Sequence, residues 1–310
     1  MSSGLSEYVN SVFEQPWWLD TVAPEKWKEI LVKEEGRIIA RWPIVEMGWG
    51  IGMPKLTQTL GFWLDDKVLK SDKYLYERKR ITNLLLHQVY KYKNIKVTLD
   101  HNVNYFLPMY WDDFVIQPCI SYRIIDLSDL EQIYDRFSKN VKRNINTARR
   151  KVDIKTIDNI EFLIQLLEKT FNKQNRKLPI SKDLVRNIYI SSKENQSSRL
   201  LYALNREGNV ISGCLFIFDK NVCYYLLPGN DPKYSNTGAN ALLIWEGIRF
   251  ASTVSKSFDF EGSMIEGIEN YFQQFGGTPI VYYQIRKQSI ILELFELLKP
   301  KLKSYIGYKR

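Results

Sequence analysis

Three apolar segments separated by two tight turns constrain the fold of this chain more than any other feature. The segments cover residues 199–205, 210–218 and 222–227, and the turns carry Glu207-Gly208-Asn209 and Asp219-Lys220-Asn221. Turns this short join neighbouring antiparallel strands. A polar loop over 228–237 then leads into a helical pattern over 238–254. The sequence therefore predicts a three-strand antiparallel meander that runs directly into a helix.

Strand-like and helical patterns alternate on both sides of this meander. After residue 118 the periodicity predicts strands at 121–127, 152–157, 258–260 and 280–285, and helices at 129–150, 161–171, 183–191 and 265–275. Before it we expect strands at 27–32, 37–43, 56–63 and 96–99, and a helix at 78–93. This order indicates a mixed α/β (α+β) fold, with mainly antiparallel twisted sheets flanked by helices.

The length of 310 residues suggests two domains. One short repeat points the same way, because Glu35–Ala40 resembles Glu207–Ser212 and each segment opens an apolar strand. We therefore predict an N-terminal domain over 1–120, which residues 286–310 could complete, and a C-terminal domain over 121–285.

The composition excludes several classes of protein. With 45% hydrophobic and 25% charged residues the chain is expected to fold rather than stay disordered. No uncharged apolar stretch reaches 18 residues, and Met1–Asp20 lacks the pattern of a signal peptide, so we expect no transmembrane segment. Three cysteines without CxxC spacing and two histidines favour a reduced, cytoplasmic protein without a metal site.

Positive charge is concentrated in one predicted helix. The net charge is +9, and residues 136–151 hold seven Lys and Arg and no acid. At 100° per residue an apolar face and a basic face separate, which suits contact with phosphates or nucleic acid, although a solvated helix face is the alternative. A second basic run, over 299–310, is of a kind common at chain ends. The candidate phosphate contacts on the basic face are Lys139, Lys142, Arg143, Arg149 and Arg150.

The junction between the meander and its helix is a candidate anion site. Small and polar residues precede the helix, whose first backbone N–H groups and positive dipole end attract anions. The alternative is an ordinary helix start in which a glycine relieves strain. The candidate cofactor-binding residues are Leu227, Asn236, Thr237, Gly238, Ala239 and Asn240.

Two carboxylates at the end of the predicted strand 258–260 are candidate catalytic groups. Alternation places Asp259 and Glu261 on one face of the strand, where one of them could accept a proton from an amine. Ser263 and Glu266 form a capping box for the next helix. Tyr283 is a weaker catalytic candidate on the last strand. Met264, Ile268, Tyr271, Phe272 and Phe275 are expected to be core residues.

The second half of the chain resembles a GNAT-type acyltransferase domain over residues 121–285. The segments 138–148, 238–246 and 258–263 further resemble the FemAB-like group, which includes peptidoglycan bridge-forming aminoacyl transferases and BioF2-like acetyltransferases. That group has two tandem GNAT-like domains. The resemblance extends to the first 120 residues only through the short repeat and the length.

The resemblance implies metal-free transfer of an acyl group to an amine. The donor would be an acyl-CoA, such as acetyl-CoA, or an aminoacyl-tRNA, and the acceptor an amine of a cell-envelope or sugar-nucleotide precursor. The donor carbonyl would lie beside strand 222–227. The acetyltransferase loop pattern Gln/Arg-x-x-Gly-x-Gly/Ala is degenerate here, because only Gly238 is kept while Ser235 and Asn240 replace the outer residues. A non-catalytic RNA-binding or phosphate-binding protein with the same fold is the alternative.

Overall fold

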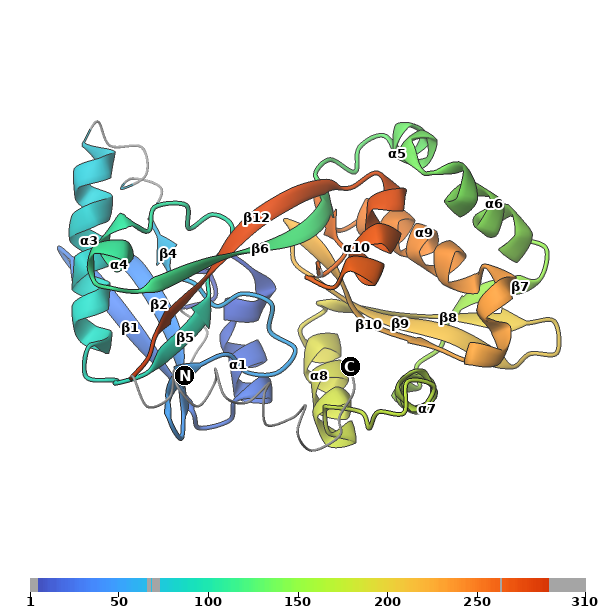
Figure 1. The fold of residues 1–310 in the computed structure, drawn as a ribbon, viewed down its shortest axis with the longest axis horizontal. Coiled ribbons are helices and arrows are strands. Elements are labelled where there is room, and N and C mark those ends of the chain that lie inside the picture. Colours follow the sequence, from blue (N-terminus) through green and yellow to red (C-terminus); the bar gives the residue numbers. More distant parts are fainter. Residues whose placement is uncertain (1–4, 66–67, 69–72, 263, 290–310) are drawn as a thin grey trace, which may run out of the picture. The chain divides into compact units, whose positions relative to one another are not determined.

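The computed structural model describes residues 5–65, 68, 73–262 and 264–289, which form two compact units (Figure 1). Among the described residues, the first unit contains 5–6, 11–24 and 119–281, and the second contains 7–10, 25–118 and 282–289. The first unit therefore takes in a short N-terminal segment that the predicted boundary at residue 120 assigns to the other domain.

The first unit is built on a mixed sheet with the strand order β6-β11-β10-β9-β8-β7. Its centre is the predicted meander, in which neighbouring strands pair antiparallel. Strand β11 joins β10 in parallel over only three residues and pairs antiparallel with β6 on its other edge. The strands are β6 (Val115–Ile124), β7 (Val152–Thr156), β8 (Ser198–Asn205), β9 (Val210–Phe218), β10 (Val222–Asn230) and β11 (Ser257–Asp259).

Helices cover both faces of this sheet (Figure 1). Helix α9 packs on β8, β9 and β10 and carries α6 on its outer side, whereas α7 and α8 cover the opposite face, where α1 packs on α8. The elements are η1 (Val12–Glu14), α1 (Pro16–Val22), α5 (Leu130–Arg136), α6 (Lys139–Ala148), α7 (Ile160–Asn172), α8 (Lys182–Glu194), η2 (Pro232–Thr237), α9 (Ala239–Ala251), α10 (Glu266–Phe272) and η3 (Gln273–Phe275).

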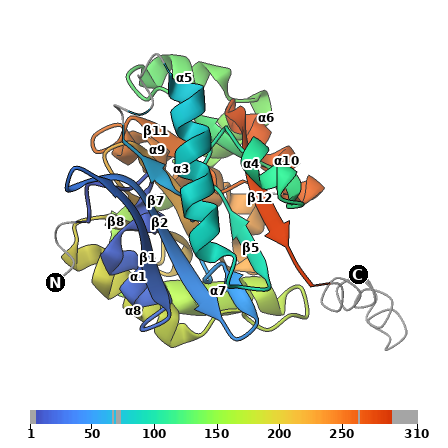
Figure 2. The same ribbon diagram turned by 90° about the vertical axis from the view of Figure 1, so that its left-hand side faces the viewer.

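The second unit has a smaller sheet with the order β1-β2-β3-β5-β12, and β4 also pairs with β2. Figure 2 shows helix α3 lying across one face of this sheet, with α4 beside it. The elements are β1 (Trp27–Glu34), β2 (Arg37–Met47), β3 (Gly50–Gly52), β4 (Trp63–Leu64), α3 (Tyr74–Val89), β5 (Ile95–Thr98), α4 (Leu107–Trp111) and β12 (Thr278–Lys287).

The predicted basic helix 129–150 is two helices rather than one. Helix α5 ends at Arg136, and Ser138 then caps α6, because its hydroxyl accepts the backbone N–H of Val141 at 3.2 Å. A serine in this position satisfies an N–H group that a new helix leaves without a partner. The predicted apolar face is confirmed, since Val141, Ile145 and Ala148 are buried.

The predicted fold class is confirmed: each unit has a mixed, mainly antiparallel sheet flanked by helices. The sequence missed α1, and in place of the strand predicted at 56–63 only the two-residue β4 forms. The domain limits at 120 and 285 stay a prediction, and residues 290–310, with the predicted basic tail, lie outside the described residues.

Candidate functional site

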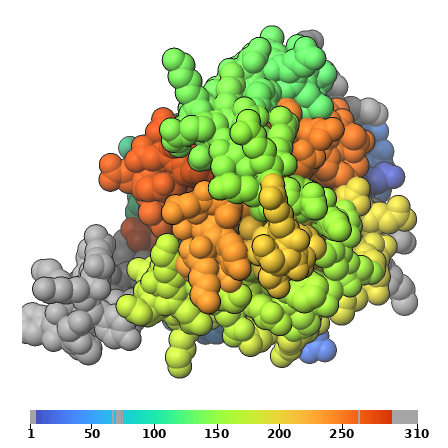
Figure 3. Space-filling view, turned by 90° about the vertical axis from the view of Figure 1, so that its right-hand side faces the viewer, coloured from blue at the N-terminus to red at the C-terminus, as the bar shows by residue number. Residues whose placement is uncertain are grey.

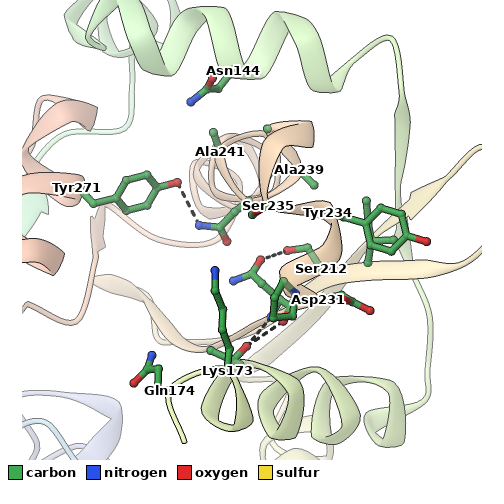
Figure 4. Close-up of a pocket in the computed structure, with 16 residues that line it drawn as sticks. Asn144, Lys173, Gln174, Ser212, Asp231, Tyr234, Ser235, Ala239, Ala241 and Tyr271 are labelled. Carbon is green, nitrogen blue, oxygen red and sulfur yellow. Dashed lines mark hydrogen bonds between the residues drawn. The ribbon is translucent and has the colours of Figure 1, made fainter.

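A pocket of about 380 Å³ lies where α9 begins, at the end of the meander (Figure 4). Helix α6 forms its upper wall, the end of α7 its floor, and α10 one side, while β9, β10 and η2 complete it. Three of the six residues predicted to hold a donor, Gly238, Ala239 and Asn240, line this pocket. The other three do not: Leu227 is buried in β10, and Asn236 and Thr237 lie in η2.

Gly238 is required by the way α6 and α9 meet. Its φ of +77° is in the left-handed region, and a Cβ placed on it would lie 2.3 Å from the carbonyl oxygen of Asn144 on α6. No other amino acid combines this φ with such a close backbone approach at low cost. The glycine therefore brings α6 against the start of α9, and Asn144 reaches the pocket as a result.

The first turn of α9 leaves backbone N–H groups at the pocket wall. The hydroxyl of Thr237 accepts the N–H of Ala239 at 3.3 Å, whereas Gly238, the N-cap residue, has no side chain that could cap the helix. Asn240 and Ala241 follow, and both line the pocket. Since a helix offers no internal acceptors to its first N–H groups, this wall can bind an anion.

Asn240 is held between two tyrosines. Its Oδ1 accepts the hydroxyl of Tyr225 at 2.8 Å, and its Nδ2 donates to the hydroxyl oxygen of Tyr271 at 3.0 Å. Burial raises the pKa of Tyr271 to about 12, so this hydroxyl keeps its proton at neutral pH. Because Tyr271 accepts from Asn240 and lines the pocket, its own proton is available to a ligand. From the sequence, Tyr271 is expected only as a core residue.

Strand β10 is irregular where the donor carbonyl was expected. Its register against β9 slips between Tyr225 and Leu227, which leaves Leu226 as an extra residue in the strand. Its parallel pairing with β11 ends at Tyr224. An extra residue interrupts the ladder and leaves backbone groups without strand partners. The edge of β10 after Tyr224 can therefore offer N–H groups to a bound carbonyl.

Asp259 has a structural environment that argues against the predicted role of proton acceptor. It is fully buried, and one carboxylate oxygen lies 2.8 Å from the guanidinium of Arg123. The other oxygen accepts the hydroxyl of Ser121 at 2.5 Å and the backbone N–H of Glu261 at 2.7 Å. Both oxygens are thus occupied by β6 and by the turn after β11, so we do not propose Asp259 as the catalytic base.

Glu261 is strained and without a hydrogen-bond partner at one oxygen. Its φ is +62°, which is unusual for a side-chain-bearing residue, and its Oε1 is buried with no partner among the described residues. Burial, and then the neighbouring charge of Asp259, raise the pKa of Glu261 well above its usual value. Glu261 does not line the pocket at the start of α9, so its predicted catalytic role stays a prediction.

The remaining catalytic candidate and the capping box lie elsewhere. Tyr283 belongs to the second unit, where its ring packs on Phe106 with 4.6 Å between centroids. The predicted capping box is wrong, because α10 begins at Glu266 with Ile265 as its N-cap, and Ser263 lies outside the described residues. Of the residues predicted as core, Phe272 and Phe275 are buried, but Met264 and Ile268 are exposed.

The predicted basic face of α6 adjoins the upper wall of the pocket. Arg143 donates to Asn140, Lys142 to the backbone carbonyl of Asp135, and the guanidinium of Arg149 stacks over Tyr134. Figure 3 shows α6 (green), η2 (light orange) and α7 (yellow-green) on one face of the first unit. The phosphate-binding role of this face stays a prediction. Its exposed members are Lys139, Arg143, Arg149 and Arg150.

Within residues 5–289, apart from the undescribed positions, no group of three or more His, Cys, Asp or Glu side chains is arranged to hold a metal ion. Nor does any helix in that part of the chain combine the length and apolarity needed to cross a membrane. The three cysteines are free and buried, and Cys214 and Cys223 lie in the core as predicted.

The fold and the pocket define a class of protein. Residues 135–272 match the family model described as "Acetyltransferase (GNAT) domain", which spans the meander, the α9 junction and α10. Over these residues the chain matches a GNAT domain, which agrees with the resemblance drawn from the sequence.

Solved structures extend the likeness to almost the whole chain. FemX has 13% identity, a TM-score of 0.66 and coverage of 96% of this chain and 97% of its own. A lysylphosphatidylglycerol synthetase C-terminal domain from Agrobacterium fabrum has 9% identity, a TM-score of 0.62 and coverage of 97% and 95%. At such low identity the likeness shows the fold alone. The chain thus matches a GNAT domain over residues 135–272, and its fold is similar to that of FemX. No curated protein matches its sequence.

Proposed function

We propose that this protein is an N-acyltransferase that moves an acyl group from a phosphate-bearing donor to an amine. The observation that carries the proposal is the pocket at the start of α9, whose wall presents backbone N–H groups. Gly238 allows α6 to approach the start of α9 and form part of this pocket. The GNAT domain implies an acyl-CoA donor in general. An aminoacyl-tRNA remains the second donor we propose, because the acetyltransferase loop pattern is degenerate and a basic face adjoins the pocket.

In the proposed reaction the amine nitrogen attacks the donor carbonyl and forms a new N–C bond. The carbonyl oxygen becomes an oxyanion, and we propose that backbone N–H groups on the edge of β10 after Tyr224, where the pairing with β11 ends, stabilise it. The C–S bond of a CoA ester, or the C–O bond of an aminoacyl ester, then breaks. The amine gives up its proton to solvent, because Glu261, the base expected from the sequence, does not line the pocket and has a pKa that burial raises well above its usual value.

We further propose that Tyr271 donates its proton to the leaving group. Its hydroxyl is oriented by Asn240, whose amide is fixed in turn by the buried hydroxyl of Tyr225. A raised pKa keeps the proton on Tyr271 until a stronger base, such as a leaving thiolate or alkoxide, forms beside it.

Tyr271→Phe tests this role. It should lower kcat about 100-fold, in the range that one general acid contributes, and change the KM for the donor little. Leu242→Met, on the buried side of α9, is a conservative control that should leave both constants near the wild type. Equal kcat values for Tyr271→Phe and the wild type would remove Tyr271 from the reaction.

Acceptor-dependent transfer is the test of the whole proposal. The protein is incubated with acetyl-CoA or with charged tRNA and a panel of amines, including amino sugars linked to nucleotides and peptide precursors of the cell envelope. Mass spectrometry then detects the acylated amine, and thiol release follows the CoA reaction. These acceptors, and a site of action in the cytoplasm, are our proposals for the biological reaction.

A non-catalytic RNA-binding protein is the second candidate, and the exposed basic face of α6 is the observation that favours it. It predicts tight, salt-sensitive RNA binding and no acyl transfer from either donor. Acylated product that disappears in Tyr271→Phe would exclude it.

A further inference from the structure

A second cationic surface borders the pocket, in the loop that follows α7. Residues 172–177 read Asn-Lys-Gln-Asn-Arg-Lys, and all six are exposed and none is acidic. Lys173 and Gln174 line the pocket, and Figure 4 shows Lys173 extending from α7 toward the start of α9. Three cations in six residues are common in protein sequences, so only the neighbouring pocket distinguishes this loop.

The charge of Lys173 is not neutralised by the acid that shares its pocket. Asp231 lies 2.7 Å from the ammonium group of Lys169 and also accepts the backbone N–H of Lys233. Within the described part of the chain, Lys173, Arg176 and Lys177 form no ion pair. The ammonium group of Lys173, at the floor of the pocket, therefore keeps a positive charge that no acidic side chain of the described residues neutralises, opposite the N–H groups of α9.

Hydrogen bonds order the backbone from which the cations of this loop extend. The N–H of Lys173 donates to the carbonyl of Lys169 at 3.2 Å and closes the last turn of α7. The N–H of Arg176 donates to the carbonyl of Phe171 at 3.1 Å and closes a turn in which Asn175 has a φ of +52°. A preordered loop loses less entropy when it binds an anion than a mobile one would.

We propose that Lys173, with Arg176 and Lys177 outside it, binds the phosphate groups of the ligand that enters this pocket. The phosphate would lie between the ammonium group of Lys173 and the first N–H groups of α9, which approach it from opposite walls. This inference rests on the proposed function, since it takes the donor to be the ligand. The pyrophosphate of a CoA ester and the phosphodiesters at the 3′ end of a tRNA share the required chemistry.

Binding measurements on Lys173→Gln test the proposal. Lys220→Gln is the matched control, because Lys220 is an exposed lysine in the turn at the opposite end of the β9–β10 hairpin. Calorimetry measures the affinity of each full-length variant for CoA and for a short RNA hairpin ending in CCA. Lys173→Gln should bind about tenfold more weakly, the effect of one charge-assisted hydrogen bond, and Lys220→Gln should equal the wild type.

The double variant Arg176→Gln/Lys177→Gln extends the test outside the pocket. It should weaken binding further and flatten its dependence on salt concentration, because it removes two positive charges from the loop beside the pocket. A loss confined to CoA identifies a CoA ester as the donor, and a loss confined to the hairpin identifies tRNA. Melting temperatures check that every variant is folded.

Two outcomes would overturn the inference and are distinguishable. Wild-type affinity in Lys173→Gln for a ligand that the unaltered protein binds would remove Lys173 from the phosphate site and leave the acyltransferase proposal intact. Failure of the unaltered protein to bind either CoA or the hairpin would reject both the phosphate site and the proposed donors.

Discussion

Gly238 is the residue on which the pocket depends most directly. Replacement by alanine should destabilise the protein for two reasons, the left-handed φ of +77° and the 2.3 Å approach of the new Cβ to the carbonyl of Asn144. Gly208 is a matched control, because it has a φ of +81° but no atom lies within 4 Å of the position that its Cβ would take. We expect Gly208→Ala to cost about 1 kcal/mol and Gly238→Ala about 3 kcal/mol.

Urea unfolding of the two variants measures the difference. Gly238→Ala should also bind the donor more weakly, because α6 must move away from the start of α9 to admit the methyl group. Equal losses of stability in both variants would mean that α6 shifts at little cost in free energy and that Gly238 is needed only for its left-handed φ.

Glu261 makes the stability of the fold depend on pH. Burial raises its pKa in the folded state, whereas in the unfolded chain the carboxyl titrates near its ordinary value. Between these two values the folded state binds more protons than the unfolded state, so the free energy of unfolding falls as pH rises. Glu261→Gln removes this dependence.

The melting temperature of Glu261→Gln should therefore match that of the wild type near pH 4 and exceed it progressively up to pH 8. Each kcal/mol corresponds to about 2–4 °C in a protein of this size. Glu266→Gln, on the exposed side of α10, is the control and should show no such trend. A constant difference across the pH range would show that Glu261 is ionised in the folded protein.

At the scale of elements, α6 combines a buried stripe with a face that contributes little to stability. Substitution of its exposed cations by glutamine should change the melting temperature by less than about 2 °C, since exposed charges contribute little. The variant should nevertheless bind an RNA hairpin more weakly, with a shallower dependence on salt. Unchanged RNA affinity would show that this face has no role in phosphate contact. The substituted residues are Lys139, Arg143, Arg149 and Arg150.

Elements that depend on neighbouring residues could be predicted from the sequence, and those that depend on distant ones could not. The meander and the α9 junction follow from local alternation, tight turns and Gly238. The break between α5 and α6 also has a local signal, the capping Ser138, but the continuous basic pattern obscured it. Helix α1 has only a short local signal, Pro16 at its first position, and it is stabilised by packing on α8, where Thr21 donates to Ser191, 170 positions further along the chain.

In the candidate site, too, the parts formed by neighbouring residues could be predicted and the parts formed by distant residues could not. Its wall at the start of α9 was predicted, because a glycine, small residues and a helix pattern are adjacent in the sequence. Its floor and side were not, because Lys173 and Tyr271 reach the pocket only when the sheet brings α7 and α10 around it. The prediction of Asp259 as a proton acceptor has a related origin. Its partner Arg123 lies 136 positions earlier, so the sequence could not show that the carboxylate is paired.

At the scale of the whole molecule, the first unit is not continuous in sequence, and this has a testable consequence. Residues 11–24 belong with 119–281, and Phe13 stacks on Tyr224 of β10 with 4.7 Å between ring centroids. A fragment spanning the predicted domain 121–285 lacks η1 and α1, so it should expose Tyr224 and the face of α8 that α1 covers.

We expect this fragment to bind a hydrophobic dye. The comparison fragment joins residues 5–24 to residues 119–289 through a flexible linker. The shorter fragment should melt at least about 10 °C below it, because the loss of a buried aromatic ring alone costs about 3–5 kcal/mol. Calorimetry of the two fragments makes the comparison. Phe13→Ala in the full chain isolates the aromatic contact and should account for part of the loss. If the shorter fragment melts as high as the longer one, the N-terminal segment only rests on the first unit, and the continuous domain predicted from the sequence is the true folding unit.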